Sequence, residues 1–192
     1  MMETILGLCI GVGLSAACGF RVFVPLLAMS IATLMGWYQP AQGFEWLALP
    51  SVCMALGFAT LCEIAAYYVP WVDNLLDSIA TPAAVVAGTL TTMAVSSGEM
   101  SQFATWAAAL IVGGGTAGVV QMSTVAARGV STATTGGLGN FVISTGELIG
   151  SIVLSILAFI MPALIAVLVI VFIIVAARWI RSKKQEKLSH SL

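Results

Sequence analysis

The sequence from Gly13 to Pro25 reads "GLSAACGFRVFVP". It places a glycine, an arginine and a proline inside an apolar segment that runs from about Thr4 to Trp37. A single helix of that length would measure about 50 Å, whereas the hydrocarbon core of a bilayer is about 30 Å thick. The sequence therefore predicts a broken or strongly tilted helix, with Gly19 and Pro25 marking the break.

A second interruption lies between residues 129 and 147, which read "GVSTATTGGLGNFVISTGE". The spacing of Gly137-x-x-x-Phe141-Val142 matches that of Gly19-x-x-x-Phe23-Val24. We interpret the two stretches as paired interruptions in membrane helices. The residues expected to break the second helix are Gly136, Gly137 and Gly139.

The composition sets the class of protein. Of 192 residues, 60% are hydrophobic and 8% are charged, whereas soluble domains carry roughly 25% charged residues. Apolar stretches of about 20 residues recur along the chain, and each is long enough to cross a bilayer. We expect an all-α, multi-pass membrane protein. The net charge of -1 gives no reason to expect a nucleic-acid partner, and no cofactor is indicated.

The apolar pattern predicts about six transmembrane segments. Their approximate bounds are 4–37, 48–68, 81–98, 102–125, 140–159 and 163–180. Thr81 and Pro82 suit the N-cap and the first position of the third helix. Residues 1–181 form one transmembrane domain and 182–192 a basic tail, which the excess of Lys and Arg places in the cytoplasm. A re-entrant hairpin in the first segment would change the number of crossings by one.

The two interruptions predict an internal repeat. Repeat one covers about 4–98 and repeat two about 102–181, and each holds one Gly-interrupted, Phe-Val-containing stretch. Repeats of three helices insert with opposite orientations, and interrupted helices in corresponding halves indicate a binding site near the midplane.

Charged side chains inside the membrane cost roughly 2.5–3.5 kcal/mol each, so they are candidates for function. The candidate substrate- or ion-binding residues are Arg21, Glu63, Asp73, Asp77, Arg128, Asn140 and Glu147. Their acids and arginines carry a net charge of about -2 when ionised, which favours a cation or a proton as ligand. The arginines could instead clamp an anionic headgroup. Structural pairing between helices is a third interpretation. No metal is identified.

An enzyme is not expected. The only histidine, His190, lies in the polar tail, which leaves no Ser-His or His-Glu pairing. Cys9, Cys18, Cys53 and Cys62 lie in apolar runs and are interpreted as buried small hydrophobic residues.

Three motifs carry a family resemblance. "GLSAACGFRVFVPLLA", "EIAAYYVPWVDNLLDSIATPAAVVAG" and "RGVSTATTGGLGNFVISTGE" resemble the bacterial membrane family called domain of unknown function 4126, over about residues 6–160. The resemblance implies a multi-pass protein of the bacterial inner membrane. By position it singles out Glu63, Asp73, Asp77, Gly139, Asn140 and Glu147. Arg21 stands where the family usually has a polar Asn, and Phe141 where Pro is usual. No activity is implied.

Our leading interpretation is a small secondary transporter, cation- or proton-linked, with a midplane site between the two breaks. The alternatives are binding or translocation of an anionic lipid or lipid-linked phosphate through Arg21 and Arg128, and a non-catalytic membrane scaffold. The expected partners are the lipid bilayer and a small ion, a proton or an anionic lipid. The Gly7-x-x-x-Gly11 face is compatible with a homodimer.

Overall fold

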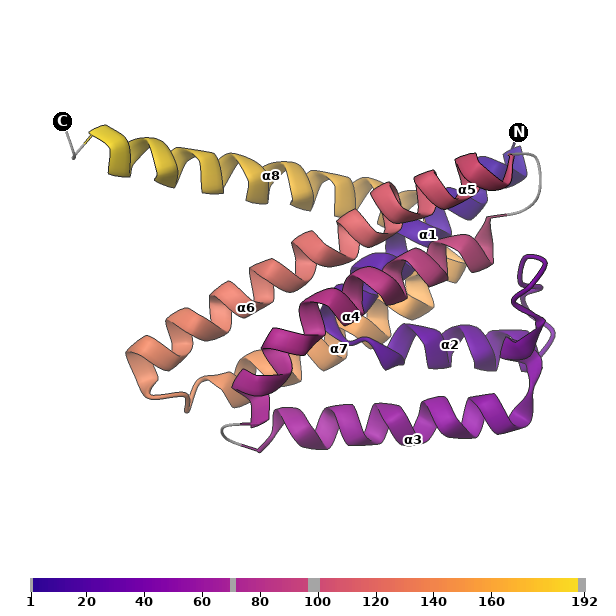
Figure 1. The fold of residues 1–192 in the computed structure, drawn as a ribbon, viewed down its shortest axis with the longest axis horizontal. Helices are drawn as coiled ribbons and strands as arrows, with labels where there is room; N and C mark the ends of the chain where they lie inside the picture. Colours follow the sequence, from indigo (N-terminus) through magenta and orange to yellow (C-terminus); the bar gives the residue numbers. More distant parts are fainter. Residues whose placement is uncertain (1, 70–71, 97–100, 190–192) are drawn as a thin grey trace.

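A computed structural model describes residues 2–69, 72–96 and 101–189, and of residues 2–3, 73–74, 176–177 and 179–189 it gives only the helical backbone. All regular secondary structure in this described part is helical (Figure 1). The α-helices are α1 (Met2–Phe20), α2 (Phe23–Leu34), α3 (Pro50–Tyr67), α4 (Val72–Val95), α5 (Gln102–Ala108), α6 (Gly115–Thr135), α7 (Asn140–Ile160) and α8 (Pro162–Ser189). A 3-10 turn, η1 (Glu45–Ala48), precedes α3, and a π-helical stretch, η2 (Ala109–Gly114), joins α5 to α6.

The fold is that of a membrane protein. Four helical stretches are long and apolar enough to cross a bilayer, namely Pro50–Tyr67, Leu75–Val95, Gln102–Thr135 and Asn140–Ile160. Three apolar helical stretches are shorter, namely Thr4–Phe20, Phe23–Leu34 and Pro162–Val175. The expected membrane class is therefore confirmed, whereas six crossings are not established.

The first predicted break is present, and it reverses the chain. α1 runs from the N-terminal end of the molecule toward its middle, and α2 returns toward the same end (Figure 1). The helices are separated only at Arg21 and Val22. Gly19 allows α1 to approach α6, since a Cβ atom at this position would lie 2.5 Å from Cβ of Val120. The hairpin of α1 and α2 thus places its tip, the α1–α2 turn, inside the bundle.

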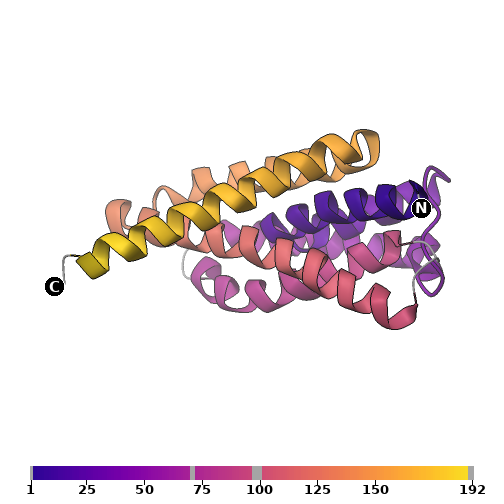
Figure 2. The same ribbon diagram turned by 90° about the horizontal axis from the view of Figure 1, so that it is seen from above.

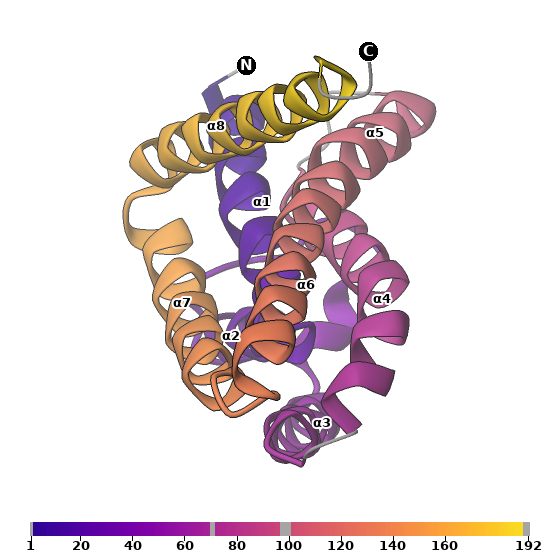
Figure 3. The same ribbon diagram turned by 90° about the vertical axis from the view of Figure 1, so that its left-hand side faces the viewer.

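The neighbours of α1 explain why this tip is enclosed. α1 packs against α4, α6, α7 and α8. An end-on view shows α1 in the middle of these helices and α3 at the edge (Figure 3). The view from above shows α8 running along one side of the bundle toward the opposite end from the start of α1 (Figure 2).

Small residues bring α1 and α4 close together. Added Cβ atoms at Gly7 and Gly11 would meet the backbone carbonyl of Val95 and the side chain of Thr92, both on α4. The Gly7-x-x-x-Gly11 face is therefore used within the chain, and it gives no support to a homodimer.

The second predicted break is smaller than the sequence suggested. Residues 131–135 remain helical, and the turn covers only 136–139. Gly136 and Gly137 have φ values of +65° and +93°, a left-handed conformation in which a Cβ atom is strained. Both long helices continue up to this turn, so it is a tight connection between α6 and α7.

The expected start of the third helix needs correction. α4 begins at Val72 rather than at Thr81, and Pro82 lies inside the helix. The helix can start early because Pro82 removes only one backbone donor, while the first turns carry Asp77 to a partner on α6. α8 runs from the apolar segment into the basic tail and ends at Ser189.

The inverted repeat is not established either. The aligned Phe-Val pairs lie at the starts of α2 and α7. These two helices run in the same direction (Figure 1), whereas helices related by an inverted repeat run in opposite directions.

Candidate functional site

Arg21 lies at the tip of the α1–α2 hairpin and is 1% exposed. Its Nη2 donates to the backbone carbonyl of Ser144 on α7 at 2.9 Å and lies 3.6 Å from Oε2 of Glu147. The side chain therefore ties the hairpin tip to α7. A long cationic side chain at this position reaches an acid inside the bundle instead of extending to water.

Arg128 on α6 holds two carboxylates. Its Nε and Nη2 donate to the two oxygens of Glu147 at 3.1 and 2.7 Å, in a bidentate pair. Its Nη1 donates to Oδ1 of Asp77 on α4 at 2.7 Å. Arg128 is 1% exposed and Glu147 is 4% exposed. Such charge-assisted pairs are strong and geometrically specific, so Arg128 fixes α4, α6 and α7 relative to one another.

Glu63 on α3 binds the other side of the hairpin tip. Its Oε1 accepts the backbone N–H of Val22 at 2.7 Å, and its Oε2 accepts that of Phe23 at 3.1 Å. These are among the N–H groups at the start of α2 that have no partner within the helix. A carboxylate is the favoured partner for a helix N-terminus. Glu63, on the neighbouring helix α3, therefore provides the acceptors for the free backbone N–H groups at the break.

Tyr67 is a site residue that the sequence analysis missed. It lies four residues after Glu63 on α3, and it is 4% exposed. The centre of its ring lies 3.8 Å from Cζ of Arg21 and 4.3 Å from Cζ of Arg128. An aromatic face attracts a guanidinium group. The i, i+4 spacing of Glu63 and Tyr67 was the available signal, because such residues share one face of a helix.

The structure thus brings together five of the predicted site residues, which we call the charge cluster. Its members are Arg21, Glu63, Asp77, Arg128 and Glu147. The three carboxylates and two guanidinium groups carry a net charge of about -1 when all are ionised. Five different segments supply them, namely the hairpin tip, α3, α4, α6 and α7.

The two arginines of the charge cluster differ in how many acceptors they have. All three side-chain nitrogens of Arg128 donate to a carboxylate. Of the three nitrogens of Arg21, Nη2 has an acceptor, while the buried Nε and Nη1 have none within the described part of the protein. A buried charged donor without an acceptor is costly. Arg21 is therefore the member of the cluster with spare capacity to bind.

The other predicted site residues lie apart or cannot be placed. The side chain of Asp73 lies outside the described residues. Asn140 begins α7, where its Nδ2 donates to Oγ1 of Thr132 across the α6–α7 turn at 3.1 Å. Of the predicted break residues, Gly19 lies in the last turn of α1 and Pro25 in the first turn of α2. Among the described residues, no three His, Cys, Asp or Glu side chains gather as metal ligands would.

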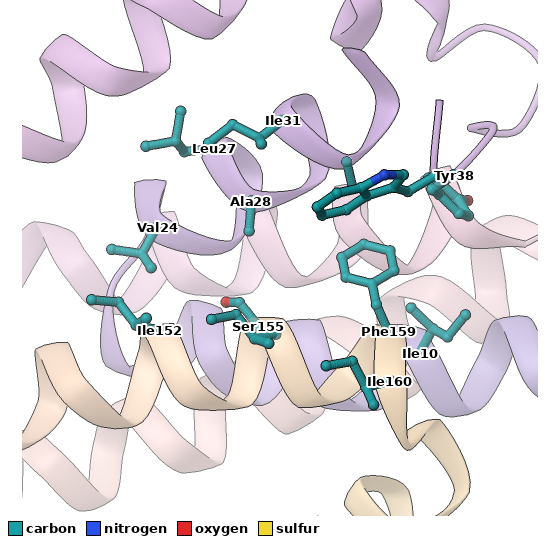
Figure 4. A pocket seen from close by; sticks show the side chains of 13 residues that line it. Ile10, Val24, Leu27, Ala28, Ile31, Tyr38, Ile152, Ser155, Phe159 and Ile160 are labelled. Atoms are coloured by element: carbon teal, nitrogen blue, oxygen red, sulfur yellow. The ribbon is translucent and has the colours of Figure 1, made fainter. Parts of the chain in front are cut away.

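A pocket of about 640 Å³ lies between α2 and α7 (Figure 4). Val24 and Ile152 stand at one end, and Tyr38 and Phe159 at the other. The lining is apolar and aromatic except for Ser155 and the hydroxyl of Tyr38, whose pKa is raised by burial. Such a volume lies in the usual range for small-molecule sites, which is about 300–1,000 Å³.

Comparison with known proteins identifies a family and nothing beyond it. The profile of the family described as Domain of unknown function (DUF4126) matches residues 8–182. No curated protein and no solved structure matched the chain. The match covers both turns, the charge cluster and the pocket, and it agrees with the resemblance carried by the three sequence motifs. The chain therefore belongs to the DUF4126 family.

Proposed function

We propose that the protein is a small secondary transporter of the bacterial inner membrane, coupled to protons or to a cation. The observation that carries this proposal is the charge cluster at the tip of the hairpin. Ionisable side chains inside membrane proteins are costly, and they mark pathways of substrates, ions and protons. Here five of them meet at a place where the helical backbone is interrupted.

The interrupted backbone supports transport because it can respond to a proton. Glu63 uses both carboxylate oxygens to accept N–H groups from the start of α2. A protonated carboxyl group turns one of its oxygens into a donor. Protonation of Glu63 would therefore weaken its hold on the hairpin tip. Broken helices serve transporters in this way, by placing free backbone groups beside the substrate.

The charge balance supports coupling to a positive ion. The cluster has a net charge of about -1, so the uptake of a proton or a cation lowers its electrostatic energy. This effect is larger when an anion enters at the same time. The orientation in this proposal follows from the tail, where five of the seven cationic residues lie at Arg178 or beyond. It places the C-terminus in the cytoplasm.

One observation favours a second candidate function, the binding of an anionic lipid. Arg21 has two buried donors without acceptors, and these could donate hydrogen bonds to the oxygens of a headgroup. Arg128 does not share this property, since its donors are occupied by Glu147 and Asp77. A headgroup clamp formed by both arginines would first have to break three charge-assisted hydrogen bonds.

Proton flux in proteoliposomes tests the transport proposal. Vesicles with an internal pH dye are exposed to gradients of Na⁺, of K⁺ and of small organic anions, one at a time. The wild-type protein should move protons with at least one of these solutes, and Glu147→Gln should abolish the signal. Glu45→Gln is the matched control, because Glu45 is an exposed acid of the loop before α3. No proton movement with any solute, or equal flux in E147Q, would contradict transport and favour a scaffold.

A further inference from the structure

The two unpaired donors of Arg21 define an anion-binding position. Nε and Nη1 have no acceptor although the side chain is only 1% exposed. Glu147 is already held by Arg128 through both oxygens, and Glu63 is held by backbone N–H groups. Both neighbouring acids thus already accept other donors, and Nε and Nη1 of Arg21 are open to an acceptor from outside the chain.

The apolar pocket lies further along the two helices, α2 and α7, that flank this position. Its inner end is formed by Val24 and Ile152 (Figure 4). Val24 lies in the first turn of α2, three residues after Arg21 in the sequence, and Ile152 lies about 8 Å beyond Glu147 along α7. Ser155, whose buried hydroxyl lines the pocket, lies on the same buried face of α7 as Glu147. The charge cluster and the pocket are therefore consecutive along the same two helices.

The pocket also opens toward the surroundings of the protein. Ile31, Ile156 and Ile160 line it and are 38%, 51% and 68% exposed. In a membrane-spanning bundle such side chains face hydrocarbon, so an apolar chain can enter the pocket from the bilayer. No charged residue lines the pocket. The charged groups nearest to its inner end along α2 are Glu63, whose oxygens accept the N–H groups of Val22 and Phe23, and Arg21, which has donors without acceptors.

We propose that the site binds a lipophilic monocarboxylate, with its carboxylate on Arg21 and its single apolar chain in the pocket between α2 and α7. The inference rests on the proposed transport function, because it names the substrate class of the same site. A monoanion fits better than a phosphate, because the cluster already carries a net charge of about -1 and a dianion would add twice the repulsion. A single chain fits a pocket that extends between two helices and is open along one side.

Equilibrium binding of octanoate tests the proposal. The full chain is placed in nanodiscs of phosphatidylcholine, and binding is measured by titration calorimetry. Octanol has the apolar chain without the charge, and acetate has the charge without the chain. Each should bind about 10- to 100-fold more weakly than octanoate, since each lacks one half of the recognition. Octyl phosphate and phosphatidylglycerol should also bind more weakly.

Two variants locate the ligand. Ala28→Phe fills the pocket and leaves the charge cluster unchanged, and it should remove octanoate binding. Ala55→Phe makes the same change on the exposed face of α3 and should bind as the wild type does. Arg21→Lys keeps the charge but loses the planar fork formed by Nε and Nη1, and it should weaken binding by about 10- to 100-fold.

Several outcomes of these binding measurements would overturn the proposal. Equal affinity for acetate or octanol, or full affinity in A28F or R21K, would overturn the proposal. Tighter binding of octyl phosphate or of phosphatidylglycerol would overturn it in favour of a phosphate headgroup. Failure here is distinguishable from failure of transport, because binding is measured without a gradient. A protein that moves protons with another solute but does not bind octanoate would keep the transport function and lose this substrate.

Discussion

At the α1–α2 turn the chain reverses beside Arg21, which is 1% exposed, whereas at the α6–α7 turn it reverses beside Leu138, which is 77% exposed. The first turn contains no residue with positive φ, and the free N–H groups after it are accepted by Glu63 from another helix. The second depends on two left-handed glycines and on a local bond from Gly139 N–H to Thr135. The enclosed break is thus satisfied by a partner distant in the sequence, and the exposed one by groups within a few residues of the turn.

The largest expected effect comes from the partners of the enclosed break. Arg128→Met should lower the free energy of unfolding by about 3–5 kcal/mol, because it removes the bidentate partner of the buried Glu147 carboxylate and one hydrogen bond to Asp77. The measurement is unfolding in mixed micelles. Arg178→Met removes the same charge from an exposed position on α8 and should have little effect. Equal losses in the two variants would mean that the cluster is not buried.

The next effect concerns the hold of Glu63 on the hairpin tip. Glu63→Gln leaves one oxygen to accept and adds an NH₂ group that cannot, so about 1.5–3 kcal/mol of stability should be lost. Hydrogen exchange at the amides of Val22 and Phe23 should become faster. Glu45→Gln is the control, since Glu45 accepts the Gly43 N–H with both oxygens but in an exposed loop. Unchanged protection of Val22 and Phe23 would refute the role of Glu63.

Glycine should matter for packing at the enclosed break. Gly19→Ala forces a methyl group against Val120 and the backbone carbonyl of Ala117. Overpacking of this kind costs about 1–3 kcal/mol. The control is Gly57→Ala on α3, where nothing lies within 4 Å of the added carbon. Thermal unfolding of the two variants should therefore shift in opposite directions, and a stable G19A protein would show that α1 and α6 are not in close contact.

Glycine should matter for backbone conformation at the exposed turn, and here the effect is smallest. Gly137→Ala places a Cβ atom at φ +93° and should cost about 1–2 kcal/mol. Gly129→Ala, in open space on α6, should instead stabilise the protein by about 0.5–1 kcal/mol. Melting curves of the purified variants provide the test. A neutral G137A variant would argue against the left-handed turn.

The local features of the fold were predictable from the sequence. The expected helix 140–159 agrees with α7 to within a residue, and the first break was expected between Gly19 and Pro25. Both rest on apolar length and on breaker residues, which are local signals. Thr81 and Pro82 gave an equally clear local signal for a helix start, and it was wrong. Contacts of the helical turns before Thr81, such as the one between Asp77 and Arg128, outweighed this local signal.

The members of the candidate site were more predictable than their arrangement. Arg21, Glu63 and Glu147 were recognisable because charge in an apolar helix is rare. Their partners were not, because pairing between distant segments leaves no trace in spacing along one chain. The i, i+4 spacing from Glu63 places Tyr67 on the same helix face, but it does not reveal the two guanidinium groups that lie against its ring.

The α1–α2 turn lies inside the protein, whereas the α6–α7 turn lies at its surface. Cysteine labelling distinguishes these two positions. Cys9, Cys18, Cys53 and Cys62 are first replaced, and a single cysteine is introduced by Val22→Cys or by Leu138→Cys. A membrane-impermeant maleimide is then applied to sealed vesicles of each orientation. We expect rapid labelling of L138C from the face that carries the basic tail, and no labelling of V22C from either face in the absence of substrate. Equal labelling of the two positions would contradict it.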